Sequence, residues 1–168
     1  LFSLTRCSSA PTYVVFGKPD GEAVELANVE AGRGGFAIRG SAAGDGSGFS
    51  VSGAGDVNGD GLADVLVGAP GASPGGRYGA GESYVVFGKP GGEAVELADV
   101  EAGRGGFAIR GSADARSAAS VSGAGDVNGD GLADVIIGAP RADPGGRGYA
   151  GESYVVFGKP GGEAVELA

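Results

Sequence analysis

Short apolar runs separated by glycine-rich turns recur along the chain. Residues 84–87, Tyr-Val-Val-Phe, form a β-branched and aromatic run that ends at Pro90, and proline cannot continue a hydrogen-bonded ladder. Residues 64–67 form a second apolar run that ends at Gly68 and Pro70. These patterns predict strands at about 49–54, 64–67, 83–87 and 35–39, the last recurring at 106–110. The stretch 91–105 fits either a helical turn or an edge strand, and we expect it to be mainly loop.

Glycine makes up 38 of the 168 residues, about three times the usual share of roughly 7%. There is no Gly-X-Y period, so a collagen-like structure is excluded. The glycines gather in clusters between the apolar runs, as expected for many short strands joined by tight turns. We therefore predict an all-β fold.

The chain repeats itself. Residues 13–40 recur at 84–111 with two changes, Asp20→Gly91 and Asn28→Asp99. Residues 51–70 recur at 121–140, again with two changes, and a third copy begins at Tyr154. A period of about 70 residues that contains several strands fits a four-stranded propeller blade better than a solenoid coil of about 20 to 30 residues.

Counting strands predicts roughly two and a quarter blades. We expect an unmatched lead-in at 1–12, a partial blade at 13–48 with its third and fourth strands, a complete blade at 49–118, and a partial blade at 119–168 with its first three strands. A propeller ring needs about four to eight blades, so this chain forms an incomplete ring. Its start without methionine also suggests a piece of a longer protein. We expect the ring to be completed by further blades of the parent chain, and assembly from several copies is the alternative.

Two identical acidic loops, 56–64 and 126–134, join the first and second strands of a blade. In each, side-chain oxygens stand at loop positions 1, 3, 5 and 9, and glycine at position 6 permits the bend that turns the carbonyl of position 7 inward. All donors are hard oxygens and the chain has no histidine, which favours Ca²⁺ over zinc or copper. We predict one calcium ion per loop, held by Asp56, Asn58, Asp60, the Leu62 carbonyl and Asp64, and by Asp126, Asn128, Asp130, the Leu132 carbonyl and Asp134.

Two other interpretations of these loops are weaker. An EF-hand requires glutamate at position 12, where this chain has Val67 or Ile137, and helical flanks. A plain hairpin turn explains the Asn-Gly and Asp-Gly pairs, but not three converging carboxylates, whose repulsion would raise their pKa values. A bound dication removes that conflict, so we expect calcium to stabilise the blades.

The segment 49–61, followed by residues 64–70 with their Gly-Ala-Pro exit, resembles the FG-GAP repeat of integrin α subunits and bacterial surface proteins. The resemblance implies a seven-bladed propeller with calcium in the loops of one face, an extracellular or cell-surface location, and adhesion or ligand binding. The family's Phe-Gly pair is Phe49-Ser50 in one copy and Ala119-Ser120 in the other. The second blade thus lacks an aromatic residue expected at the blade interface.

Charge and composition exclude several classes of partner. A net charge of −9 argues against nucleic acid and anionic membrane surfaces, and no apolar run reaches the roughly 18 residues of a membrane span. The chain has no P-loop and no Gly-X-Ser-X-Gly elbow, and its only thiol, Cys7, lies outside the repeats. We expect no catalysis, with Asp45, Asp114, Glu82 and Glu152 as solvated charges.

We expect the partner to be an extracellular protein or a glycan. A lectin-like propeller is one alternative, since Tyr78 and Tyr149 are flanked by glycine and suited to stacking on sugar rings. A non-catalytic part of a larger extracellular hydrolase is another. The chain has no Arg-Gly-Asp, and we expect Arg33 and Arg104 to be solvated rather than to recognise a ligand.

Overall fold

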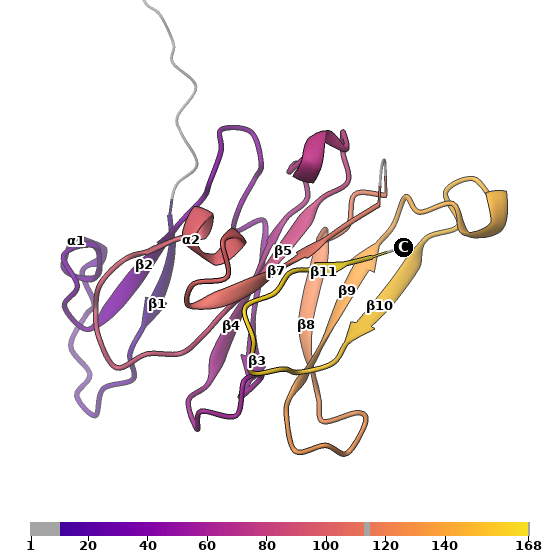
Figure 1. Cartoon of the computed structure of the whole chain (residues 1–168). Helices are drawn as coiled ribbons and strands as arrows, with labels where there is room; N and C mark the ends of the chain where they lie inside the picture. The colour runs from indigo at the N-terminus through magenta and orange to yellow at the C-terminus, as the bar shows by residue number, and fades with distance from the viewer. Residues whose placement is uncertain (1–10, 113–114, 168) are drawn as a thin grey trace, which may run out of the picture.

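The apolar runs form the strands of three β-sheets in the computed structural model, which describes residues 11–112 and 115–167 (Figure 1). The first sheet has the order β1 (Thr12–Val15), β2 (Gly35–Arg39), β6 (Val95–Glu96). The middle sheet has the order β11 (Val165–Glu166), β7 (Gly106–Arg110), β5 (Glu82–Val86), β4 (Asp64–Ala69), β3 (Ser50–Gly55). The third sheet has the order β10 (Glu152–Val156), β9 (Asp134–Ala139), β8 (Ser120–Gly125). The short helices are α1 (Leu26–Glu30), α2 (Leu97–Glu101), η1 (Pro74–Gly76) and η2 (Pro144–Gly146).

Strands β3, β4, β5 and β7 of the middle sheet pair antiparallel, one with the next, as the four strands of one blade do. They begin and end within two residues of the positions expected from the sequence. The predicted all-β fold, built of partial propeller blades, is confirmed, and in the described residues none of the sheets closes into a barrel. Thr12, assigned from the sequence to the lead-in, pairs with Ile38 as the first residue of β1, while residues 1–10, including Cys7, lie outside the described part.

The stretch after each Tyr-Val-Val-Phe strand reaches back to the preceding sheet. We call residues 88–96 and 158–166 the straps. Strand β6 of the first strap pairs parallel with β2, and β11 of the second pairs parallel with β7 (Figure 1). The ammonium group of Lys89 lies 5.0 Å from the ring centre of Phe36, and that of Lys159 lies 4.6 Å from the ring centre of Phe107. The expectation of a mainly loop segment at 91–105 is wrong for residues 95–101, which form β6 and α2, the edge strand and the helical turn that the sequence left open.

Hydrophobic core fills both faces of the middle sheet. One cluster, between the first and middle sheets, includes Phe36, Val67, Tyr84, Val86 and Leu97. The other, between the middle and third sheets, includes Leu66, Val85, Phe107, Val135 and Ile137. Neighbouring residues of β4 and β5 thus point into opposite clusters, which explains why these strands are continuous apolar runs instead of alternating ones.

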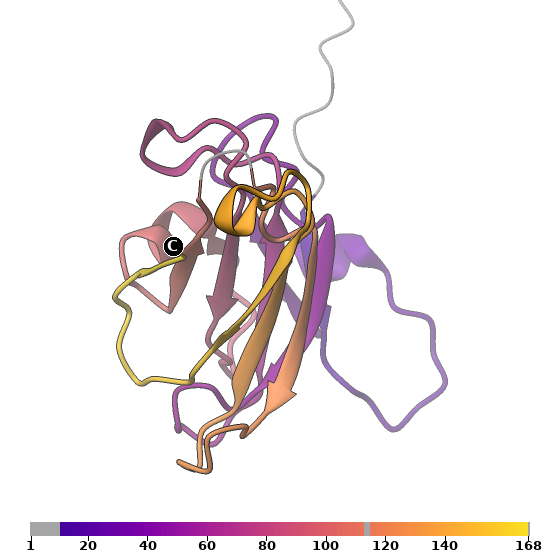
Figure 2. The ribbon, with the colours of Figure 1, turned by 90° about the vertical axis from the view of Figure 1, so that its right-hand side faces the viewer.

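Strands β3 and β8 of successive sheets pack closely against one another, and Figure 2 shows them from the side. Gly68 of β4 permits a close approach of the residues just before β8, because a Cβ atom there would lie 2.4 Å from the carbonyl oxygen of Ala118. The side chain of Phe49 is 71% exposed, so the aromatic residue expected at a blade interface lies mostly in solvent here. No helix in the described residues is long and apolar enough to span a bilayer.

Candidate metal loops and the opposite loop face

The two acidic loops connect β3 to β4 and β8 to β9, and both lie at the lower ends of their sheets in Figure 1. The first residue of each loop organises its backbone. The Oδ1 atom of Asp56 accepts hydrogen bonds from the N–H groups of Gly59 (2.7 Å) and Asp60 (3.1 Å), and its Oδ2 accepts one from Gly61 (2.8 Å). Asp126 makes the same three contacts, with Gly129, Asp130 and Gly131. The carboxylate at position 1 thus stabilises the tightly curved loop backbone that the spacing predicts.

The residues at positions 3 and 5 contact each other. The Oδ1 atom of Asn58 accepts the N–H of Asp60 (2.9 Å), and its amide nitrogen donates to Asp60 Oδ2 (2.9 Å). Asp60 Oδ1 accepts the N–H of Leu62 (2.8 Å). The second loop repeats this arrangement with Asn128, Asp130 and Leu132. Both loops therefore hold the predicted donor residues in one repeated local structure.

The carboxylate at position 9 is buried. Asp64 is 1% exposed and accepts N–H groups from Val57 (2.8 Å) and from Gly88 (2.7 Å), the first residue of the strap. Burial raises the pKa of Asp64, and the charges of Asp60 and Asp56 raise it further, against the lowering effect of the two N–H donors. In the second loop Asp134 is fully buried and bonds to Val127 and Gly158. Position 9 thus ties the loop to the strap.

The predicted donors are of the chemical type that calcium prefers, because they are carboxylate, amide and carbonyl oxygens. One of the carboxylates is buried and lies near two other negative charges. The carboxylates themselves are turned toward backbone N–H groups. Across residues 11–112 and 115–167 no group of three or more acidic or cysteine side chains is gathered closely enough to hold a metal ion. In the second loop the pKa of Asp130 is lowered, because its carboxylate accepts hydrogen bonds from the N–H of Leu132 and from Asn128. Calcium binding by the ten predicted residues stays a prediction.

Other acids considered in the sequence form structural contacts. Glu82 is 4% exposed, accepts the hydroxyl of Tyr84 (3.0 Å) and pairs with Arg110 (3.1 Å). Arg110 also pairs with Glu166 of the second strap (3.3 Å), and Tyr84 donates to Glu101 (2.9 Å) as well. The equivalent Arg39 pairs with Glu30 and with Glu96 of the first strap. These contacts fasten each strap to the sheet before it.

The remaining candidates have simpler surroundings. The guanidinium group of Arg33 donates a hydrogen bond to Asn28, and that of Arg104 pairs with Asp99. Both arginine side chains are exposed, as expected from the sequence. Glu152 accepts the hydroxyl of Tyr154. Asp114 lies outside the described residues.

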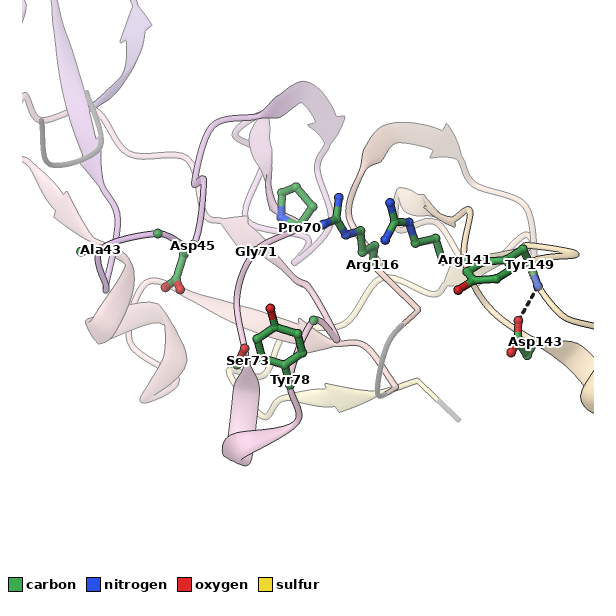
Figure 3. A pocket seen from close by; sticks show the side chains of 12 residues that line it. Ala43, Asp45, Pro70, Gly71, Ser73, Tyr78, Arg116, Arg141, Asp143 and Tyr149 are labelled. Atoms are coloured by element: carbon green, nitrogen blue, oxygen red, sulfur yellow. Dashed lines mark hydrogen bonds between the residues drawn. The ribbon is translucent and has the colours of Figure 1, made fainter. Parts of the chain in front are cut away.

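Tyr78 and Tyr149 lie at the other end of the sheets, opposite the acidic loops, and line one hollow together with Asp45, Arg116 and Arg141 (Figure 3). The two arginines are not among the residues predicted from the sequence. A usable signal exists in the repeat itself, because Arg116 and Arg141 stand where the first copy has Gly46 and Gly71.

A family model described as FG-GAP repeat matches residues 47–86 and 117–156, and each match contains one acidic loop. The chain carries two FG-GAP repeats. Integrin alpha-PS2 of Drosophila melanogaster is 36% identical to it over 132 residues, which are 76% of this chain and 9% of that protein. Phosphatidylinositol-glycan-specific phospholipase D of Mus musculus is 35% identical over 107 residues, 64% of this chain and 12% of that protein. Integrin alpha-E of Mus musculus is 35% identical over 102 residues, 55% of this chain and 8% of that protein. The chain thus spans only a small part of the length of these relatives.

Proposed function

We propose that this chain is a calcium-binding segment of an FG-GAP propeller in a secreted or cell-surface protein, where it serves as a scaffold for adhesion or ligand binding. The observation that carries the proposal is the pair of acidic loops, which are identical in sequence and in hydrogen bonding. The similarity to two integrin alpha chains supports the adhesive role and the extracellular location.

Calcium would act on folding through the strap. Asp64 and Asp134 each join a loop to the first glycine of the following strap, and the straps bind the preceding sheets. The positive charge of an ion bound between the half-buried Asp56, the exposed Asp60 and the buried Asp64 would offset the repulsion among their carboxylates. Metal binding would then stabilise the loop, the strap and the contact between neighbouring sheets together.

We also propose that the chain itself is not catalytic. It has no histidine, and the buried Glu82 is held by Tyr84 and Arg110 within a contact that fastens a strap. Similarity to a phospholipase D covers 12% of that protein, so a role as a non-catalytic part of a larger hydrolase is the alternative. Further blades of a parent chain are the partners proposed to complete the ring, with other copies of this chain as the alternative.

Thermal unfolding in calcium and in excess EGTA tests the proposal. At free calcium of about one hundred times Kd, one site contributes about 2.7 kcal/mol, which raises the Tm of a chain this size by roughly 5–10 °C. The double variant D60N/D130N removes an exposed carboxylate from each loop and should lose most of this shift while remaining folded. The control D20N removes an exposed carboxylate outside the loops and should keep it. A wild-type Tm that is the same in calcium and EGTA would contradict the proposal.

A further inference from the structure

The differences between the two repeat copies are concentrated at one end of the sheets. Residues 50–65 and 120–135, which contain the acidic loops, are identical. Between 41–83 and 111–153, all differences except Leu66→Ile136 and Val67→Ile137 fall in the loops 41–49 and 71–79 and their counterparts 111–119 and 141–149. Apart from these two conservative changes, the differences between the copies lie in the loops opposite the acidic loops.

These variable loops surround a hollow of about 850 Å³ at this end of the sheets (Figure 3). Its lining includes Asp45, Ser73, Tyr78, Arg116, Arg141 and Tyr149. The volume lies in the range of roughly 300–1,000 Å³ typical of small-ligand sites, so it admits a short oligosaccharide.

Backbone hydrogen bonds hold the two arginines in place. The N–H of Arg116 donates to the carbonyl oxygen of Gly79 (3.0 Å), and the N–H of Arg141 donates to that of Ala115 (3.2 Å). Arg116 has a φ of 47°, in the left-handed region where the first copy has Gly46. That conformation is unfavourable for a residue with a Cβ atom, so Arg116 is held there against a local energetic penalty.

The arginines bring positive charge to a protein whose net charge is −9. Both are exposed, and neither forms an ion pair with any residue in the described ranges. The first copy has Gly71 at the position of Arg141 and has no room for a side chain there, because a Cβ atom at Gly71 would lie 2.4 Å from the carbonyl oxygen of Gly44. Asp45 and Asp143 also line the hollow, but in the described residues neither carboxylate forms an ion pair with either arginine. Guanidinium groups bind carboxylates through paired N–H donors, so these two unpaired groups point to an anionic ligand group.

The rest of the lining suits a ring that carries hydroxyl groups. Tyr78 is 83% exposed and Tyr149 is 76% exposed, which leaves aromatic surface available for the apolar face of a sugar. Asp45 and Ser73 provide oxygens that accept hydrogen bonds from hydroxyl groups. Asp143 accepts the N–H of Tyr149 and so fixes that residue at its φ of 54°.

We propose that this hollow binds a carboxylate-bearing saccharide, with Arg116 and Arg141 on the carboxylate, Asp45 and Ser73 on hydroxyl groups, and the two tyrosines against the sugar rings. The inference rests on the proposed scaffold function, for which it names a ligand class. It does not require calcium in the acidic loops, because the hollow lies at the opposite end of the sheets.

Isothermal titration of the full chain with tetragalacturonate and with its methyl ester tests this, because the ester keeps the sugar rings and hydroxyl groups but replaces each carboxylate charge by a neutral methyl ester. Wild-type protein should bind tetragalacturonate at least about tenfold more tightly than the ester, as expected for lost charge-assisted hydrogen bonds. The double variant R116G/R141G, which restores the residues of the first copy, should lose affinity by a similar factor. The control R104A removes an exposed arginine outside the hollow and should bind as wild type does.

Several results would overturn the inference: no binding of tetragalacturonate, equal binding of the ester, or unchanged binding by R116G/R141G. Equal binding of hexaglutamate would show an acidic-peptide site instead. Thermal unfolding of the same samples separates the two proposals. A chain with the calcium-dependent rise in Tm but no saccharide binding contradicts this inference alone, and saccharide binding without that rise contradicts only the calcium proposal.

Discussion

Gly68 and Gly138 occupy the same position of two repeats, in β4 and β9, and neither needs a positive φ. They differ in what lies beside them. A Cβ atom on Gly68 would be 2.4 Å from the carbonyl oxygen of Ala118 in the next sheet, whereas on Gly138 the nearest atom would be the flexible Ser120 Oγ at 3.2 Å. We therefore predict opposite outcomes for G68A and G138A.

The magnitudes follow from this difference. Overpacking costs about 1–3 kcal/mol, and replacing glycine by alanine returns about 0.4–1 kcal/mol through the unfolded state. G68A should lose about 1–2 kcal/mol, a fall in Tm of roughly 2–8 °C, because the backbone of Ala118 has to move. G138A should leave the Tm unchanged or raise it by a few degrees, since only a serine side chain has to rotate.

Scanning calorimetry of both variants under one buffer condition measures the difference. Because the two sites have nearly the same sequence around them, local strand propensity affects both alike and cancels in the comparison. Equal Tm values for G68A and G138A would refute the close approach of β8 to β4 that the structure places at Gly68.

Two further predictions concern burial and charge. The L66A variant should lose about 2–5 kcal/mol of unfolding free energy, because Leu66 is fully buried. The I136A variant should lose clearly less, because Ile136 at the equivalent position is 36% exposed. Urea unfolding of both variants measures this, and equal losses would contradict the two-sided core of the middle sheet. Burial raises the pKa of Glu82 above its ordinary value of 4.5, so the folded chain holds that proton more tightly than the unfolded chain. Stability relative to E82Q should therefore rise as the pH falls from neutrality through the folded pKa toward 4.5, and a stability difference that is constant with pH would show that the carboxyl is not effectively buried.

The sequence predicted the strands well because each is a short β-branched or aromatic run bounded by glycine or proline. It could not show the role of the straps. Val95 and Val165 pair with Ile38 and Ile109, residues of the preceding sheet, and nothing in the local pattern of the straps indicates such distant parallel partners. Two-residue strands are also too short to produce an alternating pattern.

For the candidate sites too, the sequence predicted which residues are present but not how they are arranged. The order of donors in the acidic loops is visible in the sequence, and the structure places them in one repeated hydrogen-bonded curl. The direction of each carboxylate was not predictable, because in Asp56 and Asp60 the backbone N–H groups compete for the same oxygens. The hollow depends on loops from two different repeats, so Arg116 and Arg141 become neighbours only when the sheets pack.

Calcium stoichiometry tests the central claim most directly. Titration of the calcium-free chain in a calorimeter should show two ions bound per chain for the wild type and for D20N. The single variant D130N should retain one ion, at the loop that contains Asp60. A wild-type chain that binds no calcium, or a D130N variant that still binds two ions, would contradict the assignment of one calcium ion to each acidic loop.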